Sequence, residues 1–67
     1  MTPKTFGHFL RLRREQMTLT QGALAAKVGC FWSMVSKWER GVAYPNWPRC
    51  CKLADVLGVS LDYFRGK

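Results

Sequence analysis

Apolar residues recur along the chain at helical spacing, and glycine and proline interrupt them at intervals. Thr5 can cap a first helix with its hydroxyl while Pro3 stays outside, which predicts a helix over residues 6–16. One face of this helix carries an apolar stripe that is expected to face the core and consists of Phe6, Phe9, Leu10 and Met17.

The central segment predicts two short helices joined by a tight turn. Thr20 can cap the first of them, which continues to about Val28, and Gly29 can take the left-handed conformation that ends it. The next helix covers about residues 31–39, and Gly41 closes it. Such a pair is the helix-turn-helix pattern. The apolar positions expected to hold the pair in place are Leu24, Ala25, Val28, Cys30, Val35 and Trp38.

The C-terminal third predicts two more helices, so the expected fold is all-α with five helices. Asn46 can cap a helix over residues 47–57, where Pro48 is tolerated because the first turn needs no backbone donor. Ser60 can cap a last short helix over residues 61–66. The expected apolar face of the longer helix consists of Trp47, Cys50, Cys51, Leu53, Ala54 and Leu57.

A turn of about 100° per residue sorts the side chains of the third helix. Val35 and Trp38 point inward, and Phe31 projects between them. Glu39 lies beside buried positions, where an unpaired carboxylate is unfavourable, and Arg14 is the expected partner in a bidentate ion pair. The residues expected to face outward are Trp32, Ser33, Ser36, Lys37 and Arg40.

The size and net charge of the chain indicate its domain organisation and the kind of partner it binds. The chain has 67 residues and a mass of 7.7 kDa, so we expect residues 1–67 to form a single domain. Eleven Lys and Arg against four Asp and Glu give a formal net charge of +7, which favours a polyanionic partner. A generally basic surface without a partner is the alternative explanation of the charge.

The residues that carry chemistry in enzymes and metal sites are sparse. The three cysteines, Cys30, Cys50 and Cys51, lack the spacing of a zinc site or a disulfide framework, and His8 is the one histidine. We expect no metal, cofactor or small-molecule ligand and no enzymatic activity. The sequence contains no apolar run of membrane-spanning length and no secretory signal, so we expect a cytoplasmic protein that binds no membrane.

Several segments at fixed spacing resemble the Cro/CI-type helix-turn-helix family, which includes the DNA-binding domains of lambdoid phage repressors and Cro proteins. The resemblance runs from Leu10 to Phe64. Its segments are Arg14, LTQ at 19–21, LA at 24–25, VG at 28–29, WERG at 38–41, Pro45 and LADVLGVSLDYF at 53–64.

The resemblance implies a compact five-helix, lambda-repressor-like domain that binds double-stranded DNA as a homodimer on a two-fold symmetric operator, with the third helix in the major groove. The implied function is sequence-specific regulation of transcription, of the repressor type. A protein-interaction or antitoxin-like co-regulator module on the same fold is the alternative.

Matching positions assign roles to individual residues. Those implied to read bases are Phe31, Trp32, Ser33 and Lys37. Those implied to contact the DNA backbone are Thr20, Arg40, Tyr44 and Asn46. Gln21 is implied to buttress the third helix or to touch phosphate, and Arg14 and Glu39 occupy the family's buried salt bridge.

The family often carries polar residues at the positions of Phe31 and Trp32. The hydrogen bonds that such residues make to bases therefore cannot be assigned to these two side chains. Phe31 can meet thymine methyl groups or belong to the core. Trp32 can contact sugars and base edges, or it can anchor a partner protein.

Overall fold

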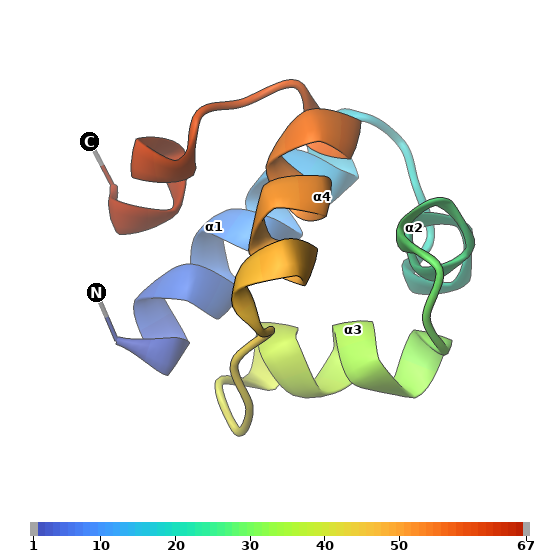
Figure 1. The fold of residues 1–67 in the computed structure, drawn as a ribbon, viewed down its shortest axis with the longest axis horizontal. Coiled ribbons are helices and arrows are strands. Elements are labelled where there is room, and N and C mark those ends of the chain that lie inside the picture. Colours follow the sequence, from blue (N-terminus) through green and yellow to red (C-terminus); the bar gives the residue numbers. More distant parts are fainter. Residues whose placement is uncertain (1, 67) are drawn as a thin grey trace.

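The computed structural model describes residues 2–66 and contains four α-helices followed by a short 3₁₀-helix (Figure 1). Helix α3 runs along one edge of the molecule, with α2 beside its N-terminal end and the 41–46 loop beside its C-terminal end. Helices α1 and α4 stand between α3 and the opposite edge. The elements are α1 (Pro3–Gln16), α2 (Gln21–Val28), α3 (Trp32–Arg40), α4 (Trp47–Leu57) and η1 (Leu61–Arg65).

The all-α class is confirmed, but the prediction of five α-helices is wrong. The last element, η1, is a 3₁₀-helix of five residues. A 3₁₀-helix is the common form of so short a segment, because its tighter i to i+3 bonds need fewer residues. Ser60 precedes η1 without a side-chain capping bond, so the prediction of a Ser60 cap is wrong as well.

The predicted start of α1 is also wrong. Thr2, and not Thr5, caps the helix: the Thr2 hydroxyl oxygen accepts from the Thr5 backbone N–H at 3.1 Å. Pro3 therefore lies inside the first turn, where its missing N–H leaves no bond unmade. The predicted caps of α2 and α4 are confirmed, because Thr20 accepts from the Ala23 N–H and Asn46 from the Arg49 N–H, each at 3.0 Å.

One hydrophobic core joins all five elements. Leu12 is exposed, and Phe9 and Met17, predicted to face the core, are only half-buried at its edge. Trp47 contradicts its prediction, because it is 68% exposed. It is the first residue of α4, where the helix has not yet reached the core. The fully buried large side chains are Phe6, Leu10, Leu24, Val35, Trp38, Leu53, Leu57 and Phe64.

Helices α1 and α3 cross in direct backbone contact at Gly7. A Cβ atom at this position would lie 2.3 Å from the Trp38 carbonyl oxygen and 2.8 Å from that of Glu39. Both distances are far below van der Waals contact, so only glycine fits without a shift of one helix. The crossing fixes the C-terminal half of α3 against α1. Within residues 2–66, no helix has the length and apolarity needed to cross a membrane.

Candidate nucleic-acid interface

The turn between α2 and α3 is built from a left-handed glycine. Gly29 has φ +87°, and its N–H donates to the Ala25 carbonyl, as does the N–H of Cys30. Both bonds go to the single Ala25 carbonyl, and the left-handed Gly29 ends the helix within one residue. Leu24 and Ala25 on α2 and Val35 and Trp38 on α3 then turn toward the common core. The opposite side of α3 is left for solvent.

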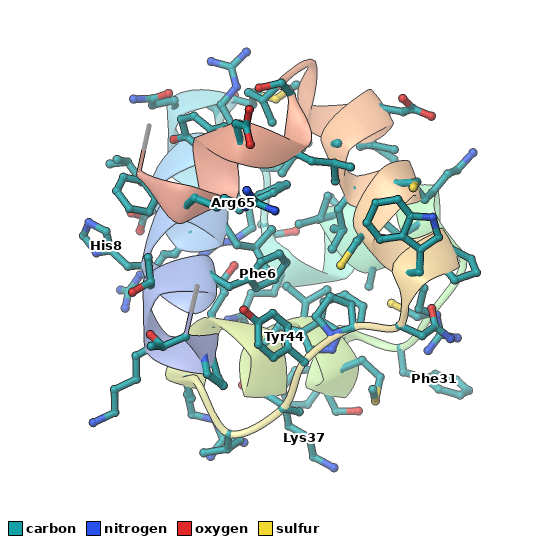
Figure 2. The ribbon with its side chains drawn as sticks, turned by 60° about the vertical axis from the view of Figure 1, so that its left-hand side comes forward. Phe6, His8, Phe31, Lys37, Tyr44 and Arg65 are labelled. Carbon is teal, nitrogen blue, oxygen red and sulfur yellow. The ribbon has the colours of Figure 1, made fainter. Side chains whose placement is uncertain are left out.

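The outer side of α3 presents polar, basic and aromatic groups together. Ser33, Lys37 and Arg40 are exposed, and Trp32 is 61% exposed. In Figure 2 the Lys37 side chain extends from α3 away from the core, and Phe31 projects outward near the start of the same helix. Hydroxyl groups and cationic side chains are hydrogen-bond donors for base edges and phosphates.

Phe31 is exposed and does not belong to the core, so the core interpretation is wrong. Its side chain is 81% exposed. Its backbone is extended, with φ −83° and ψ 151°, because it is the N-cap residue of α3 and not part of the helix. A projection at 100° per residue applies only to helical residues, which is why it placed Phe31 on the inner face.

The segment of the chain that forms this surface carries one acidic side chain. Between residues 16 and 54 the sequence contains a single acid, Glu39. The Glu39 side chain is 4% exposed, and its carboxylate is paired with Arg14. The electrostatic field over α3 is therefore set by Lys37 and Arg40, which attracts an anion.

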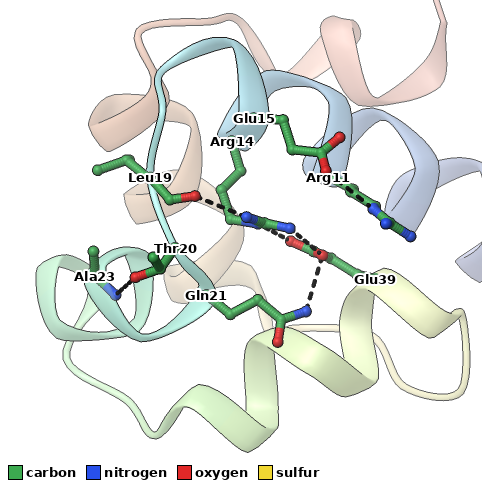
Figure 3. A network of polar contacts seen from close by, with 8 residues as sticks. All are labelled: Arg11, Arg14, Glu15, Leu19, Thr20, Gln21, Ala23 and Glu39. Atoms are coloured by element: carbon green, nitrogen blue, oxygen red, sulfur yellow. Dashed lines mark hydrogen bonds and ion pairs between the residues drawn. The ribbon is translucent and has the colours of Figure 1, made fainter.

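A buried polar network joins three elements at the back of α3 (Figure 3). Arg14 donates to Glu39 through two bonds, Nε to Oε2 at 2.6 Å and Nη2 to Oε1 at 3.0 Å. This is the bidentate geometry expected from the sequence. Arg14 Nη1 also donates to the Leu19 carbonyl at 2.7 Å, and Gln21 Nε2 donates to Glu39 Oε1 at 3.1 Å.

The network fixes how α3 is oriented relative to α1 and α2. Glu39 on α3 accepts from Arg14 on α1 and from Gln21 at the start of α2, so movement of α3 breaks bonds to both helices. Hydrogen bonding to the Glu39 carboxylate raises the pKa of Arg14 above its ordinary value, against the opposing effect of burial. One amide hydrogen of Gln21 is engaged in this buttressing contact.

The positions expected to contact a DNA backbone lie at the two ends of α3. Thr20 caps α2 on one side, and its hydroxyl hydrogen is not used by the capping bond. Asn46 caps α4 after the 41–46 loop. Tyr44, in the middle of that loop, packs its ring 5.4 Å from the ring of Phe6 while the side chain stays 39% exposed. Burial raises the pKa of Tyr44, so its hydroxyl remains a hydrogen-bond donor.

Lys4 is a basic residue near α3 that sequence reasoning did not select. A Cβ atom on Gly41 would lie 2.9 Å from the Lys4 Cγ atom, so the exposed Lys4 chain lies directly on the C-terminal cap of α3. Arg40 precedes this cap. The two positions are far apart in sequence, and only the crossing at Gly7 brings them together, so no local pattern could have identified Lys4.

Comparison with known proteins agrees with this architecture. A family model described as a helix-turn-helix domain matches residues 5–64. A curated relative, an uncharacterized transcriptional regulator in the ATPase CF(0) region of Rhodospirillum rubrum, is 34% identical over 58 residues. The match covers 87% of this chain and 54% of the relative, so the chain spans about half the length of the curated relative it matches.

Two solved structures with similar folds have different functions. The P22 c2 repressor, solved in complex with a synthetic operator, matches with a TM-score of 0.85 and 34% identity, over 88% of this chain and 89% of the repressor chain. Hydroxypropylphosphonic acid epoxidase from S. wedmorenis matches with a TM-score of 0.87 and 30% identity, over 94% of this chain but 34% of the enzyme chain.

The epoxidase match concerns about a third of that enzyme and carries no catalytic function to this chain. The repressor match covers most of both chains. Together with the family model over residues 5–64, these similarities show that the chain belongs to the helix-turn-helix domain family.

Proposed function

We propose that this domain binds double-stranded DNA in a sequence-specific manner and regulates transcription, as a repressor does. The observation that carries the proposal is the outer side of α3, where Trp32, Ser33 and Lys37 are exposed and the one acid of the helix is buried and paired. The similarity to a repressor solved in complex with its operator supports it.

Helix α3 has the size required to enter the major groove. An α-helix is about 10–12 Å across with its side chains, which matches the major groove of B-DNA, about 12 Å wide. Ser33 and Lys37 are one turn apart on the exposed side, and we assign them to base edges together with Phe31 and Trp32. Lysine can donate to the O6 and N7 acceptors of guanine.

The flanking residues are assigned to the sugar-phosphate backbone. Arg40 supplies a charge at the C-terminal end of α3, and Tyr44 and Asn46 follow it in the adjoining loop. Thr20 stands at the other end, beside the open N–H groups of the first turn of α2, where an anion is favoured. Gln21 is assigned a buttressing role because it already donates to Glu39.

We propose further that the domain acts as a homodimer. A symmetric dimer places two copies of α3 in successive major grooves, about 34 Å apart, and reads a two-fold symmetric operator. Such an arrangement doubles the contacted base pairs, which a domain of this size needs for specific binding.

Titration of duplex DNA at two salt concentrations tests DNA binding. Each phosphate neutralised by Lys or Arg contributes a slope of about −0.9 to log K against log salt. Replacing Arg40 by Ala should weaken binding to all sequences alike and reduce the slope by about 0.9, whereas replacing Lys37 by Ala should also change the sequence preference.

The matched control is Arg65→Ala, which removes the same charge from η1, away from α3 in Figure 2. Arg65 pairs with Asp62 within η1 and is not one of the assigned DNA contacts, so its loss should change affinity less than the loss of Arg40. Absence of binding, or binding that does not depend on salt, would exclude the proposed function. Tryptophan fluorescence that responds to a partner protein and not to DNA would favour the protein-interaction alternative instead.

A further inference from the structure

Phe31 combines an apolar N-cap, which lowers the stability of α3, with an aromatic ring that gains nothing from folding because it stays in water. It occupies the N-cap of α3 and makes no side-chain capping bond, although Ser, Thr, Asp or Asn at an N-cap stabilises a helix substantially more than an apolar residue does. It also leaves a phenyl ring 81% exposed to water. The N-cap residues of the other three α-helices, Thr2, Thr20 and Asn46, all make the capping bond.

The surroundings of Phe31 define what can cover the ring. It adjoins Trp32 and Ser33 at the start of α3, and Lys37 follows one turn later. No acid lies between residues 16 and 54 except the paired Glu39. An apolar group on a cationic surface calls for a partner that is anionic overall and apolar at one point.

We infer that Phe31 is a specificity-determining residue that packs on the C5-methyl group of a pyrimidine in the major groove, and that the chain gives up a capped α3 for this contact. The C5-methyl of thymine is the apolar feature of the major groove, and uracil lacks it. The inference rests on the proposed function, since it names the chemical group that one residue of the same surface recognises.

The first test replaces each thymine of a bound duplex in turn by deoxyuridine, which removes one methyl group and leaves the base-pairing edge unchanged. Wild-type affinity should fall about 3- to 5-fold at one position per half-site, the change expected for losing one buried methyl group. Phe31→Ala should bind the thymine duplex more weakly and lose the difference between thymine and uracil. Leu12→Ala, which removes an exposed apolar side chain from α1, should keep that difference.

The second test separates recognition from stability with Phe31→Ser. Serine restores an N-cap oxygen, so the thermal midpoint should rise above that of wild type while discrimination against uracil disappears. A role of Phe31 in folding alone predicts that the midpoint falls. An unchanged or lower midpoint in Phe31→Ser overturns the claim that a cap is given up.

The outcomes distinguish this inference from the function on which it rests. DNA binding that is equally strong with thymine and uracil at every position would overturn the inference and leave the proposed function standing. Uracil sensitivity that persists in Phe31→Ala would also overturn it, because the methyl group would then act through another residue or through DNA shape. Failure to bind any duplex would overturn both.

Discussion

Gly7 sets the distance between α1 and α3, because its Cα hydrogen faces the carbonyl oxygens of Trp38 and Glu39. Gly7→Ala should lower the free energy of unfolding by about 1–3 kcal/mol, the usual effect of overpacking, even though alanine is the better helix former. Gly22→Ala is the matched control, since the nearest atom to its new Cβ lies 4.0 Å away. It should stabilise the domain by up to about 1 kcal/mol. Equal effects in thermal or urea unfolding would contradict the close crossing.

Glu39 is the acceptor that holds Arg14 and Gln21 together. Glu39→Gln should lower the free energy of unfolding by about 3 kcal/mol, because the guanidinium of Arg14 then remains buried without a counter-charge. Glu15→Gln breaks an ion pair whose side chains are 63% and 54% exposed, and it should change stability by less than about 1 kcal/mol. Urea denaturation of both variants measures the two free energies of unfolding. Similar losses in the two variants would contradict the larger contribution assigned to the buried network.

Single residues were predictable where one physical constraint dominated. Glu39 required a cation because of its buried neighbours, and Arg14 was the cation at the right distance along α1. For Phe31 the projection indicated the inner side of α3 and the resemblance implied a base contact. The projection was wrong because the backbone of Phe31 is extended and not helical. The exposure of Trp47 was missed for a related reason. Its spacing places Trp47 on the apolar face of α4, but a residue in the first turn of a helix can lie beyond the edge of the core.

At the scale of elements, α4 anchors the loop that carries Tyr44 and Asn46. The Cys50 thiol, on α4, donates to the Pro45 carbonyl at 3.7 Å, and burial raises the pKa of this thiol above its ordinary value. A raised folded-state pKa means that the folded domain favours the neutral thiol. Its contribution to stability is complete below the unfolded-state pKa and is lost as pH rises through the folded-state pKa.

The thermal midpoint should therefore fall on the alkaline side of about pH 9, in addition to the general effect of deprotonating lysines. Cys50→Ala lacks the thiol, so its thermal midpoint should fall less between about pH 8 and about pH 10.5, the range in which the thiol titrates. Burial is the larger cause of the raised pKa of Tyr44 and acts in the same direction in this variant, whereas the smaller effect of Cys50 on Tyr44 is lost. Identical pH profiles of wild type and Cys50→Ala would contradict the assignment.

Among the elements, α2, α3 and α4 were predicted within one residue of their ends, since Thr20, Gly29, Gly41 and Asn46 mark those ends with specific cap chemistry. The predicted start of α1 was wrong because Thr2 and Thr5 have the same capping hydroxyl three residues apart. Pro3 is compatible with a position just before the helix or inside its first turn. The 3₁₀ form of η1 depends on how a short segment meets the core, which local sequence does not specify.

At the scale of the whole molecule, charge is distributed unevenly between pairs and free groups. Three of the four acids are engaged in ion pairs, namely Glu15, Glu39 and Asp62. The net charge of +7 is therefore carried largely by basic groups without a partner acid. The sign of the charge was available from composition, but the position of Lys4 against the C-terminal cap of α3, next to Arg40, depends on the packing of α1 on α3.

Selection of bound sequences from a random duplex pool measures whether α3 reads the base sequence of DNA. A dimer with one α3 per major groove should enrich one motif with two symmetric half-sites, about 10 base pairs apart from centre to centre. Lys37→Ala should enrich a different motif with the same spacing. A pool that stays random after repeated selection, or one enriched identically by wild type and Lys37→Ala, would contradict base reading by α3.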